Sequence, residues 1–253
     1  MSTSTLSRRA RFHRRFLIER RIMTAQARRD LNRWGAVSIA AGLALFVLLT
    51  VQVLTRTGLA TLDPAVSEWF RAKRFAEGTV VMDALATVFG PVFLPIIILG
   101  VLVLWIALAR HLWRPLLLAG GMITGMLSVQ LAAHLVQRAR PPVEYMLLGA
   151  DGTFSFPYGH VTGVCDFFLI TTFLLASRRS SPVWAIGGYA LALGMIVCQI
   201  VSRLYLGYHW LTDTLASFSL SLVMLGSVIA IDTWRTARVG AAPAAPTLTP
   251  RVR

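Results

Sequence analysis

Six apolar stretches, each long or nearly long enough to cross a membrane, constrain this chain most. A helix needs about 20 apolar residues to span roughly 30 Å of hydrocarbon. The fourth and sixth stretches are shorter, but each can extend by a turn into a polar motif beside it. We therefore expect an all-α integral membrane bundle of six transmembrane helices. The predicted spans are Trp34–Leu54, Ala84–Ala109, Pro115–Val136, Val161–Ala176, Val183–Val201 and Leu215–Ile231.

The basic charge of the chain is concentrated before the first span. Of the 253 residues, 56% are hydrophobic and only 14% are charged, a composition that excludes an ordinary soluble domain. The formal net charge is +14, and Arg is dense within residues 1–33. Because Lys and Arg beside a span mark the cytoplasmic side, this pattern favours a membrane surface and argues against a nucleic-acid partner.

The chain divides into three expected regions. Residues 1–33 form a basic cytoplasmic N-terminal segment, and residues 34–231 form the membrane domain. Residues 232–253 end in a stretch rich in Ala, Pro and Thr, which predicts a disordered cytoplasmic tail. Residues 55–83 lie between the first two spans, where an amphipathic segment on the outer interface and a solvated loop both fit.

The connecting segments predict the orientation of the bundle. Arg residues at 110–114, 178–179 and 235–238 fall on the same side as the N-terminal segment, which should be cytoplasmic. Most residues whose side chains could take part in catalysis or ligand binding fall on the opposite, extracytoplasmic side. Cys165 and Cys198 lie inside apolar stretches and are expected to be small buried hydrophobes, not a disulfide or a metal site.

Polar side chains gather where the third, fourth and sixth spans reach the outer boundary. Ionisable groups at membrane depth are costly, so their presence there indicates a function. Guanidinium groups bind phosphate oxygens in a fork, and imidazoles exchange protons near neutral pH, so the cluster predicts an anion site. Its members are Arg138, Arg140, His160, Arg203, His209 and Asp213.

His209 and Asp213 are four residues apart, which places them on one face of a helix that begins near Tyr208. The carboxylate could then hold one ring nitrogen and leave the other free to attack a substrate. This spacing alone is equally compatible with a structural histidine at a helix start.

Three short segments together carry a family resemblance: Arg138-Ala139-Arg140-Pro141, Pro157-Tyr158-Gly159-His160, and the run from Ser202 to Asp213. They resemble the three-part signature of the type-2 phosphatidic acid phosphatase (PAP2) superfamily. The third element, SRxxxxxHxxxD, is matched at every defined position. The likeness covers about residues 60–231.

The resemblance implies a covalent mechanism that needs no metal or other cofactor. It makes His209 the nucleophile that takes the phosphoryl group, Asp213 its orienting partner and His160 the general acid for the leaving group. Arg140 and Arg203 would clamp the phosphate. The family's roles thus fall on residues of all three segments.

Phosphate binding is where this chain departs from the family pattern. The first element normally has a Lys seven residues before the Arg of Arg-Pro, where this chain has Ala133. The second normally has Ser where Tyr158 stands. The resemblance still implies a donor from the backbone N–H of Gly159 at a helix start. Arg138 or His134 could supply the missing charge, and His134 could equally be a packed boundary histidine.

Asp166 lies inside the fourth predicted span, where a carboxylate needs a partner or a proton. It could tune His160 or line a head-group cavity. Alternatively, it could accept a hydrogen bond from Gln199 or Gln130 within the bundle.

The predicted function is a cell-membrane phosphatase for a lipid phosphate or diphosphate, acting through a phosphohistidine at the extracytoplasmic face. The resemblance suggests phosphatidate, phosphatidylglycerophosphate or a polyprenyl diphosphate as substrate, with membrane lipids as the other partners. Two alternatives stay open. One is a transferase that moves a phosphoryl or head group between lipids, and the other is a non-catalytic lipid-phosphate binding protein.

Overall fold

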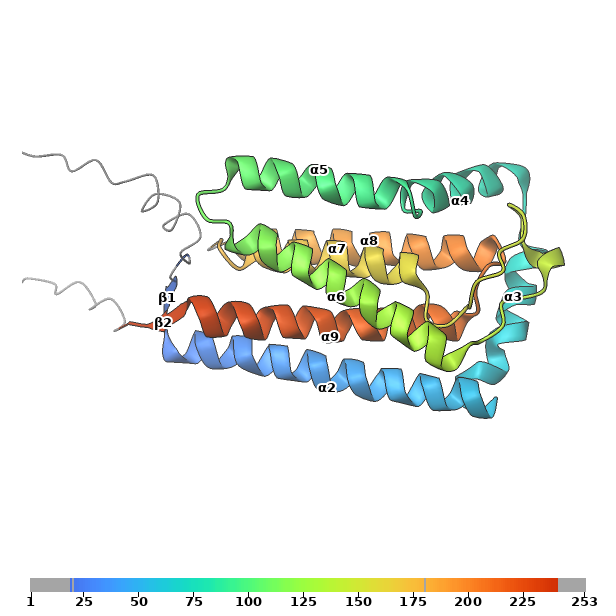
Figure 1. Ribbon diagram of the computed structural model, residues 1–253, viewed down its shortest axis with the longest axis horizontal. Coiled ribbons are helices and arrows are strands. Elements are labelled where there is room, and N and C mark those ends of the chain that lie inside the picture. The colour runs from blue at the N-terminus through green and yellow to red at the C-terminus, as the bar shows by residue number, and fades with distance from the viewer. Residues whose placement is uncertain (1–18, 20, 180, 241–253) are drawn as a thin grey trace, which may run out of the picture.

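The structure is a computed structural model that describes residues 19, 21–179 and 181–240. Most of the expected basic segment and tail, residues 1–18 and 241–253, lies outside this range. The described chain is a bundle of α-helices with short 3-10 turns (Figure 1). The helices are α2 (Ala25–Thr55), α3 (Asp63–Ala72), α4 (Ala76–Val88), α5 (Phe93–Leu108), α6 (Trp113–Val136), α7 (Gly159–Ala176), α8 (Pro182–Tyr205) and α9 (Leu211–Thr236), with η1 at Gly58–Leu62 and η2 at Val143–Tyr145.

Five helices are each long and apolar enough to cross a membrane: α2, α6, α7, α8 and α9. The consecutive helices α4 and α5 pass the same test together, although they are bent by 50° at the break between them. With this pair counted as one span, the expected six-helix membrane bundle is confirmed. Helices α7 and α9 are the most buried, whereas α2, α6 and α8 expose most of their apolar residues, as lipid-facing helices do.

The second span departs from the single helix expected over Ala84–Ala109. Helix α4 ends at Val88 and α5 begins at Phe93, with Gly90 and Pro91 in the break. Proline has no N–H to donate and its ring clashes with the preceding turn, so this dipeptide interrupts the helix. The break turns α4 toward the end of the bundle that α3 crosses (Figure 1).

Helices α2 and α9 pack along most of their length because glycines let their backbones approach. A Cβ added at Gly42 would lie 2.6 Å from the carbonyl oxygen of Ser219, and one at Gly226 would lie 2.6 Å from that of Gly35. Small residues at such crossings are the usual way for membrane helices to associate closely. The two helices run antiparallel (Figure 1).

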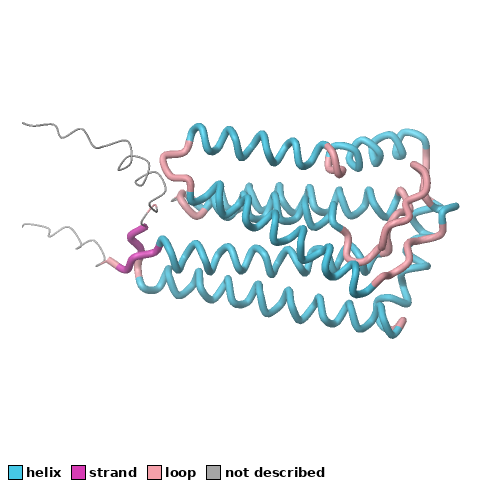
Figure 2. Tube along the Cα trace, in the orientation of Figure 1, coloured by secondary structure: helices cyan, strands magenta, loops and turns pink. Residues whose placement is uncertain are grey.

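Two segments outside the spans close the ends of the bundle. Part of the 55–83 connection folds into α3, which lies across one end with Asp63 and Ser67 buried (Figure 1). At the other end, β1 (Arg21–Met23) pairs in parallel with β2 (Ala237–Val239), an addition to the all-helical expectation (Figure 2). Helix α2 also begins at Ala25, earlier than the expected start at Trp34.

Candidate active site

The three motif segments meet at the α3 end of the bundle. They are the turn after α6, the start of α7 and the corner between α8 and α9. At that corner Gly207 has a φ of 82°, and a Cβ there would lie 2.1 Å from the carbonyl oxygen of Tyr145. Only glycine fits this close approach, which directs His209 into the protein.

His209 is fully buried, and both of its ring nitrogens have polar neighbours. Nδ1 lies 3.0 Å from the carbonyl oxygen of Ser155, and Nε2 lies 2.6 Å from Nη1 of Arg140. Burial, with the charges of Arg140 and Arg203, lowers the His209 pKa well below its usual value. A neutral ring that donates from Nδ1 to the carbonyl keeps the Nε2 lone pair for a substrate. Ser155 was not predicted from the sequence, because a backbone carbonyl leaves no signal in residue type.

Asp213 is close to His209 but has nearer partners. Its Oδ2 lies 3.4 Å from Nδ1 of His209 and accepts hydrogen bonds from the Trp210 N–H, at 2.9 Å, and the Ser155 hydroxyl. Its Oδ1 lies 2.6 Å from Nη1 of Arg138. Asp213 therefore supports the histidine electrostatically, while the Ser155 carbonyl makes the shorter contact with the ring.

Arg138 does not occupy the position expected of a residue that replaces the missing phosphate-binding cation. Its guanidinium bridges Asp213 and Asp63, each at 2.6 Å, and also donates to the Thr212 hydroxyl at 2.7 Å. Arg138 is not among the residues that line the cavity described below. Asp63 is the buried partner that fixes this orientation, a role that the sequence motifs did not indicate.

Arg140 has a partner for each of its N–H groups. A guanidinium has five donors. Here Nε donates to the Thr153 carbonyl at 2.9 Å, and Nη1 contacts the Tyr208 carbonyl at 2.9 Å and His209 Nε2. Nη2 contacts the Thr153 hydroxyl at 2.7 Å and a carboxylate oxygen of Asp151 at 3.0 Å. The side chain is therefore held by the histidine on one side and by the 151–153 loop on the other.

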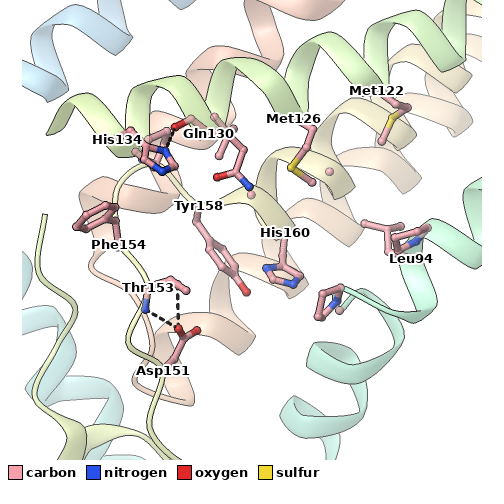
Figure 3. A pocket seen from close by; sticks show the side chains of 18 of the residues that line it. Leu94, Met122, Met126, Gln130, His134, Asp151, Thr153, Phe154, Tyr158 and His160 are labelled. Atoms are coloured by element: carbon pink, nitrogen blue, oxygen red, sulfur yellow. Dashed lines mark hydrogen bonds between the residues drawn. The ribbon is translucent and has the colours of Figure 1, made fainter. Parts of the chain in front are cut away.

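Tyr158 lies between the two histidines. Its ring centroid is 3.6 Å from that of His209 and 4.7 Å from that of His160, and the guanidinium carbons of Arg140 and Arg203 lie 5.9 and 5.4 Å from it. Burial raises the pKa of Tyr158 to about 12, so the hydroxyl keeps its proton at physiological pH. The residue that departs from the family pattern is thus central to the cluster, next to His160 (Figure 3).

Two buried polar atoms beside Tyr158 have no hydrogen-bond partner: Nε of Arg203 and Nε2 of His160. Arg203 does donate from Nη2 to the carbonyl of Ala86 at 2.8 Å. Buried polar atoms without partners are uncommon, and each calls for an explanation. A ligand with several oxygen atoms between these side chains would satisfy both.

A cavity of about 580 Å³ opens beside this cluster. One end is polar and has Arg140 in its wall. Asp151, His160 and the hydroxyl-bearing Tyr158 line the same end (Figure 3). The other end is apolar. It is lined by the α4–α5 break, by α5 and by α6, through Gly90, Pro91, Leu94, Pro95, Ile98, Met122, Met126 and Val129.

The remaining candidates occupy different surroundings. Gly159 is the first residue of α7 and lines the cavity, as does Ala133, so the wall is apolar where the family has Lys. His134 also lines it, with Nδ1 at 2.7 Å from the Gln130 carbonyl. Among the described residues, no group of three His, Cys, Asp or Glu could hold a metal ion.

Asp166 is buried in α7 without the expected amide partner. Both of its carboxyl oxygens, and both amide atoms of Gln199, have no hydrogen-bond partner. Its Oδ2 lies only 1.9 Å from where a Cβ at Gly125 would be, so the glycine makes room for it. Asp166 does not line the cavity.

Comparison with known proteins identifies relatives. The model of the PAP2 superfamily matches residues 114–237, which contain α6 to α9 and every predicted site residue. Phosphatidylglycerophosphatase B of Bacillus subtilis (strain 168) is 31% identical over 129 residues, which cover 49% of this chain and 60% of the relative. The alignment thus reaches less than two thirds of that relative's length.

A solved structure shares the fold. The crystal structure of the first transmembrane PAP2 type phosphatidylglycerolphosphate phosphatase, from Bacillus subtilis, superposes with a TM-score of 0.67 at 24% identity. The match covers 76% of this chain and 96% of that one.

Proposed function

We propose that this chain, whose residues 114–237 match the model of the PAP2 superfamily, is a metal-independent phosphatase of lipid phosphates or diphosphates. Similarity to a protein named phosphatidylglycerophosphatase B favours a phosphatidylglycerophosphate-like substrate. The observation that carries the proposal is the buried, neutral His209 whose Nε2 faces Arg140, next to His160 and a cavity with one polar and one apolar end.

The first step is attack of His209 Nε2 on the phosphorus of the substrate. The N–P bond forms as the bond from phosphorus to the leaving oxygen breaks, and His160 gives its proton to that oxygen. The Nδ1–H of His209 stays on the Ser155 carbonyl. The nearby Asp213 carboxylate, 3.4 Å away, offsets the positive charge that develops on the ring.

The second step is hydrolysis of the phosphohistidine. His160, now neutral, takes a proton from a water molecule as its oxygen attacks phosphorus, and the N–P bond breaks. Inorganic phosphate leaves, His209 is again neutral, and His160 has recovered its proton. Arg140 and Arg203 stabilise the phosphoryl oxygens in both steps, and the unpartnered Nε of Arg203 is an available donor.

The apolar end of the cavity suits the lipid part of the substrate. Its walls are the α4–α5 break and the side chains of Met122 and Met126. A lipid tail could lie there while its phosphate reaches Arg140 and His160. An alcohol in place of water in the second step would make the enzyme a transferase, which is the second candidate function.

The extracytoplasmic side of the active site is part of the proposal. Basic side chains cluster at the opposite end of the bundle, where Arg21 and Arg178 share Asp232 and where Arg114 pairs with Glu19. Since Arg marks the cytoplasmic side, the α3 end with its site would face outward. The basic segment 1–33 and the tail 232–253 would then both be cytoplasmic.

The proposal is tested by phosphate release from a panel of lipid phosphates by the purified protein, with a chelator present. We expect release by the wild type and no turnover by His209→Ala. His160→Ala should still form phosphoenzyme from a substrate with a good leaving group, because it acts on the leaving oxygen. His111→Ala, at the other end of the bundle, is the matched control.

Each alternative gives a different result in the same assay. Transfer of label from one lipid to another identifies the transferase, and binding of lipid phosphate without turnover identifies the non-catalytic protein. Activity of His209→Ala equal to that of the wild type would refute the covalent mechanism, and strict dependence on a metal would refute metal independence.

A further inference from the structure

Three of the five contacts of Arg140 go to one loop. Thr153 accepts from Nε and Nη2 through its carbonyl and its hydroxyl, and Asp151 accepts from Nη2. With the contacts to Tyr208 and His209, no donor of Arg140 is left for a phosphate. A substrate must therefore displace a protein group before Arg140 can bind it.

Asp151 is the group that most resembles a phosphate. Its carboxylate lies 3.0 Å from Arg140 Nη2 and is held in place by the N–H and the hydroxyl of Thr153, at 3.0 and 2.8 Å. It is an anion on a guanidinium, which is the interaction that a phosphoryl oxygen would make. Burial raises the pKa of Asp151, but the hydrogen bonds from Thr153 and the charge of Arg140 outweigh it, so the net shift is downward.

We propose that Asp151 is an affinity-determining residue that occupies Arg140 in the substrate-free protein and competes with the substrate's phosphate for it. The inference rests on the proposed function, because it takes Arg140 as a phosphate-binding group. Asp151 would thereby set how tightly the site holds a phosphate, in addition to any effect of the missing Lys at position 133.

The loop that carries Asp151 can leave without disturbing the bundle. It is fixed on one side by the bond from the Tyr208 hydroxyl to the Gly149 carbonyl, and on the other by the bond from Ser155 N to the Arg138 carbonyl. Between these points, a Cβ added at Gly152 would meet no atom within 4 Å, and the Asp151 side chain is 35% exposed. Its side-chain bonds in the described structure are to Arg140 and Thr153.

Displacement also explains how the nucleophile becomes accessible. Nε2 of His209 faces Arg140, and the ring of Tyr158 lies over the imidazole. When the 151–153 loop leaves, three of the five contacts that hold the guanidinium are lost, so Arg140 can move off Nε2. The exchange of one anion for another thus precedes the attack.

The test measures binding of inorganic phosphate by equilibrium dialysis and lipid-phosphate turnover, in full-length wild type and Asp151→Asn. We expect Asp151→Asn to bind phosphate about tenfold more tightly, because a charge-assisted competitor is removed. KM for a lipid phosphate should fall by a similar factor, while kcat changes less than about threefold. Asp151→Ala should behave in the same way, which would show that the effect comes from loss of the carboxylate and not from the new amide.

Glu144→Gln is the matched control, since it removes one exposed carboxylate from the same connection without touching Arg140. It should leave both phosphate affinity and KM unchanged. Unchanged or weaker phosphate binding by both Asp151 variants would overturn the competition. If no variant hydrolyses any lipid phosphate, the proposed function fails, yet tighter phosphate binding by Asp151→Asn would still support the competition.

Discussion

At the scale of single residues, the size of Tyr158 should limit the room for the proposed phosphate. Its ring lies between His160 and His209, where a smaller side chain would leave space. We expect Tyr158→Ser to raise turnover of simple lipid phosphates and Ala133→Lys to raise it through a new cation. The two together should do more than either alone if both touch the same phosphate. Steady-state kinetics of the four proteins measures this.

The outcome of that series also bears on the substrate. If Tyr158 instead shapes the pocket for a particular head group, Tyr158→Ser should lower activity on the true substrate while it raises activity on others. A folded double variant with no activity on any lipid phosphate would favour the non-catalytic binding protein.

His209 predicts an unusual pH profile. Burial and two neighbouring guanidinium groups hold its pKa well below the ordinary value of about 6.5. An ordinary histidine gains a proton and loses its nucleophilic lone pair as pH falls through that value, whereas His209 stays neutral. In His160→Ala, which removes the general acid, the rate of phosphoenzyme formation from a substrate with a good leaving group should therefore hold steady from about pH 7.5 to about 5.5, after correction for ionisation of the substrate. A rapid-quench measurement that showed a fall centred near 6.5 would contradict this.

Arg138 should contribute more to the stability of the fold than to the binding of phosphate. It is the shared partner of Asp63 and Asp213, both buried, so its removal leaves two carboxylates without a counter-charge. We expect Arg138→Ala to lower the free energy of unfolding by about 3–5 kcal/mol. Arg71→Ala, which breaks an exposed pair with Glu68, should cost about 1 kcal/mol or less. Unfolding in detergent measures both, and a stable Arg138→Ala with weakened phosphate binding would reverse this assignment.

Arg138 and Arg140 show why spacing alone could not assign the site. Both follow α6 and both are arginines, so the sequence makes either a plausible phosphate ligand. Gln137 ends the helix with a φ of 49°, and after this turn the two guanidinium groups face different partners. The partner of Arg138, Asp63, lies two spans earlier in the chain. Motif spacing predicted the cluster, but the allocation of charges within it depends on tertiary contacts.

At the scale of elements, the close approach of α2 and α9 depends on glycine. A Cβ at Gly226 would lie 2.6 Å from the carbonyl oxygen of Gly35 and 2.8 Å from a side-chain carbon of Ile39. We expect Gly226→Val to push the helices apart and to cost about 1–3 kcal/mol of stability. Gly120→Val in α6 is the control, since a Cβ there meets nothing within 4 Å. Equal melting temperatures for the two variants would show that the contact is not tight.

The membrane spans were the part of the fold that could best be predicted from the sequence. Hydrocarbon thickness fixes their length and leaves few alternatives, so apolar runs located all six. The bend between α4 and α5 was missed although Gly90 and Pro91 lie in it, because the apolar run continues across the break. The β1–β2 pair was missed because two three-residue strands far apart in sequence carry no pattern of their own.

At the scale of the whole molecule, the charge distribution predicts one topology. Residue 152, on the loop near the candidate site, should be extracytoplasmic, and residue 110 should be cytoplasmic. Cys198 is exposed and not buried as expected, so the test uses a Cys198→Ser background. There, Gly152→Cys should react with an impermeant thiol reagent in intact cells, and Arg110→Cys only after permeabilisation. The buried Cys165 should not react with the reagent. The reverse labelling pattern would place the site on the cytoplasmic side.

The ion-pair bridge from Asp63 through Arg138 to Asp213 extends beyond the region that matches the family model, so this region does not contain every contact that holds the site together. Residues 114–237 hold every predicted catalytic side chain, yet Asp63 lies outside them. A fragment that began at residue 114 would keep Arg138 on Asp213 but lose its second carboxylate, along with the whole of α2, the packing partner of α9. The boundary of sequence similarity is therefore not a boundary of folding, and a transplant of this site into another scaffold would have to bring the interfacial helix α3 with it.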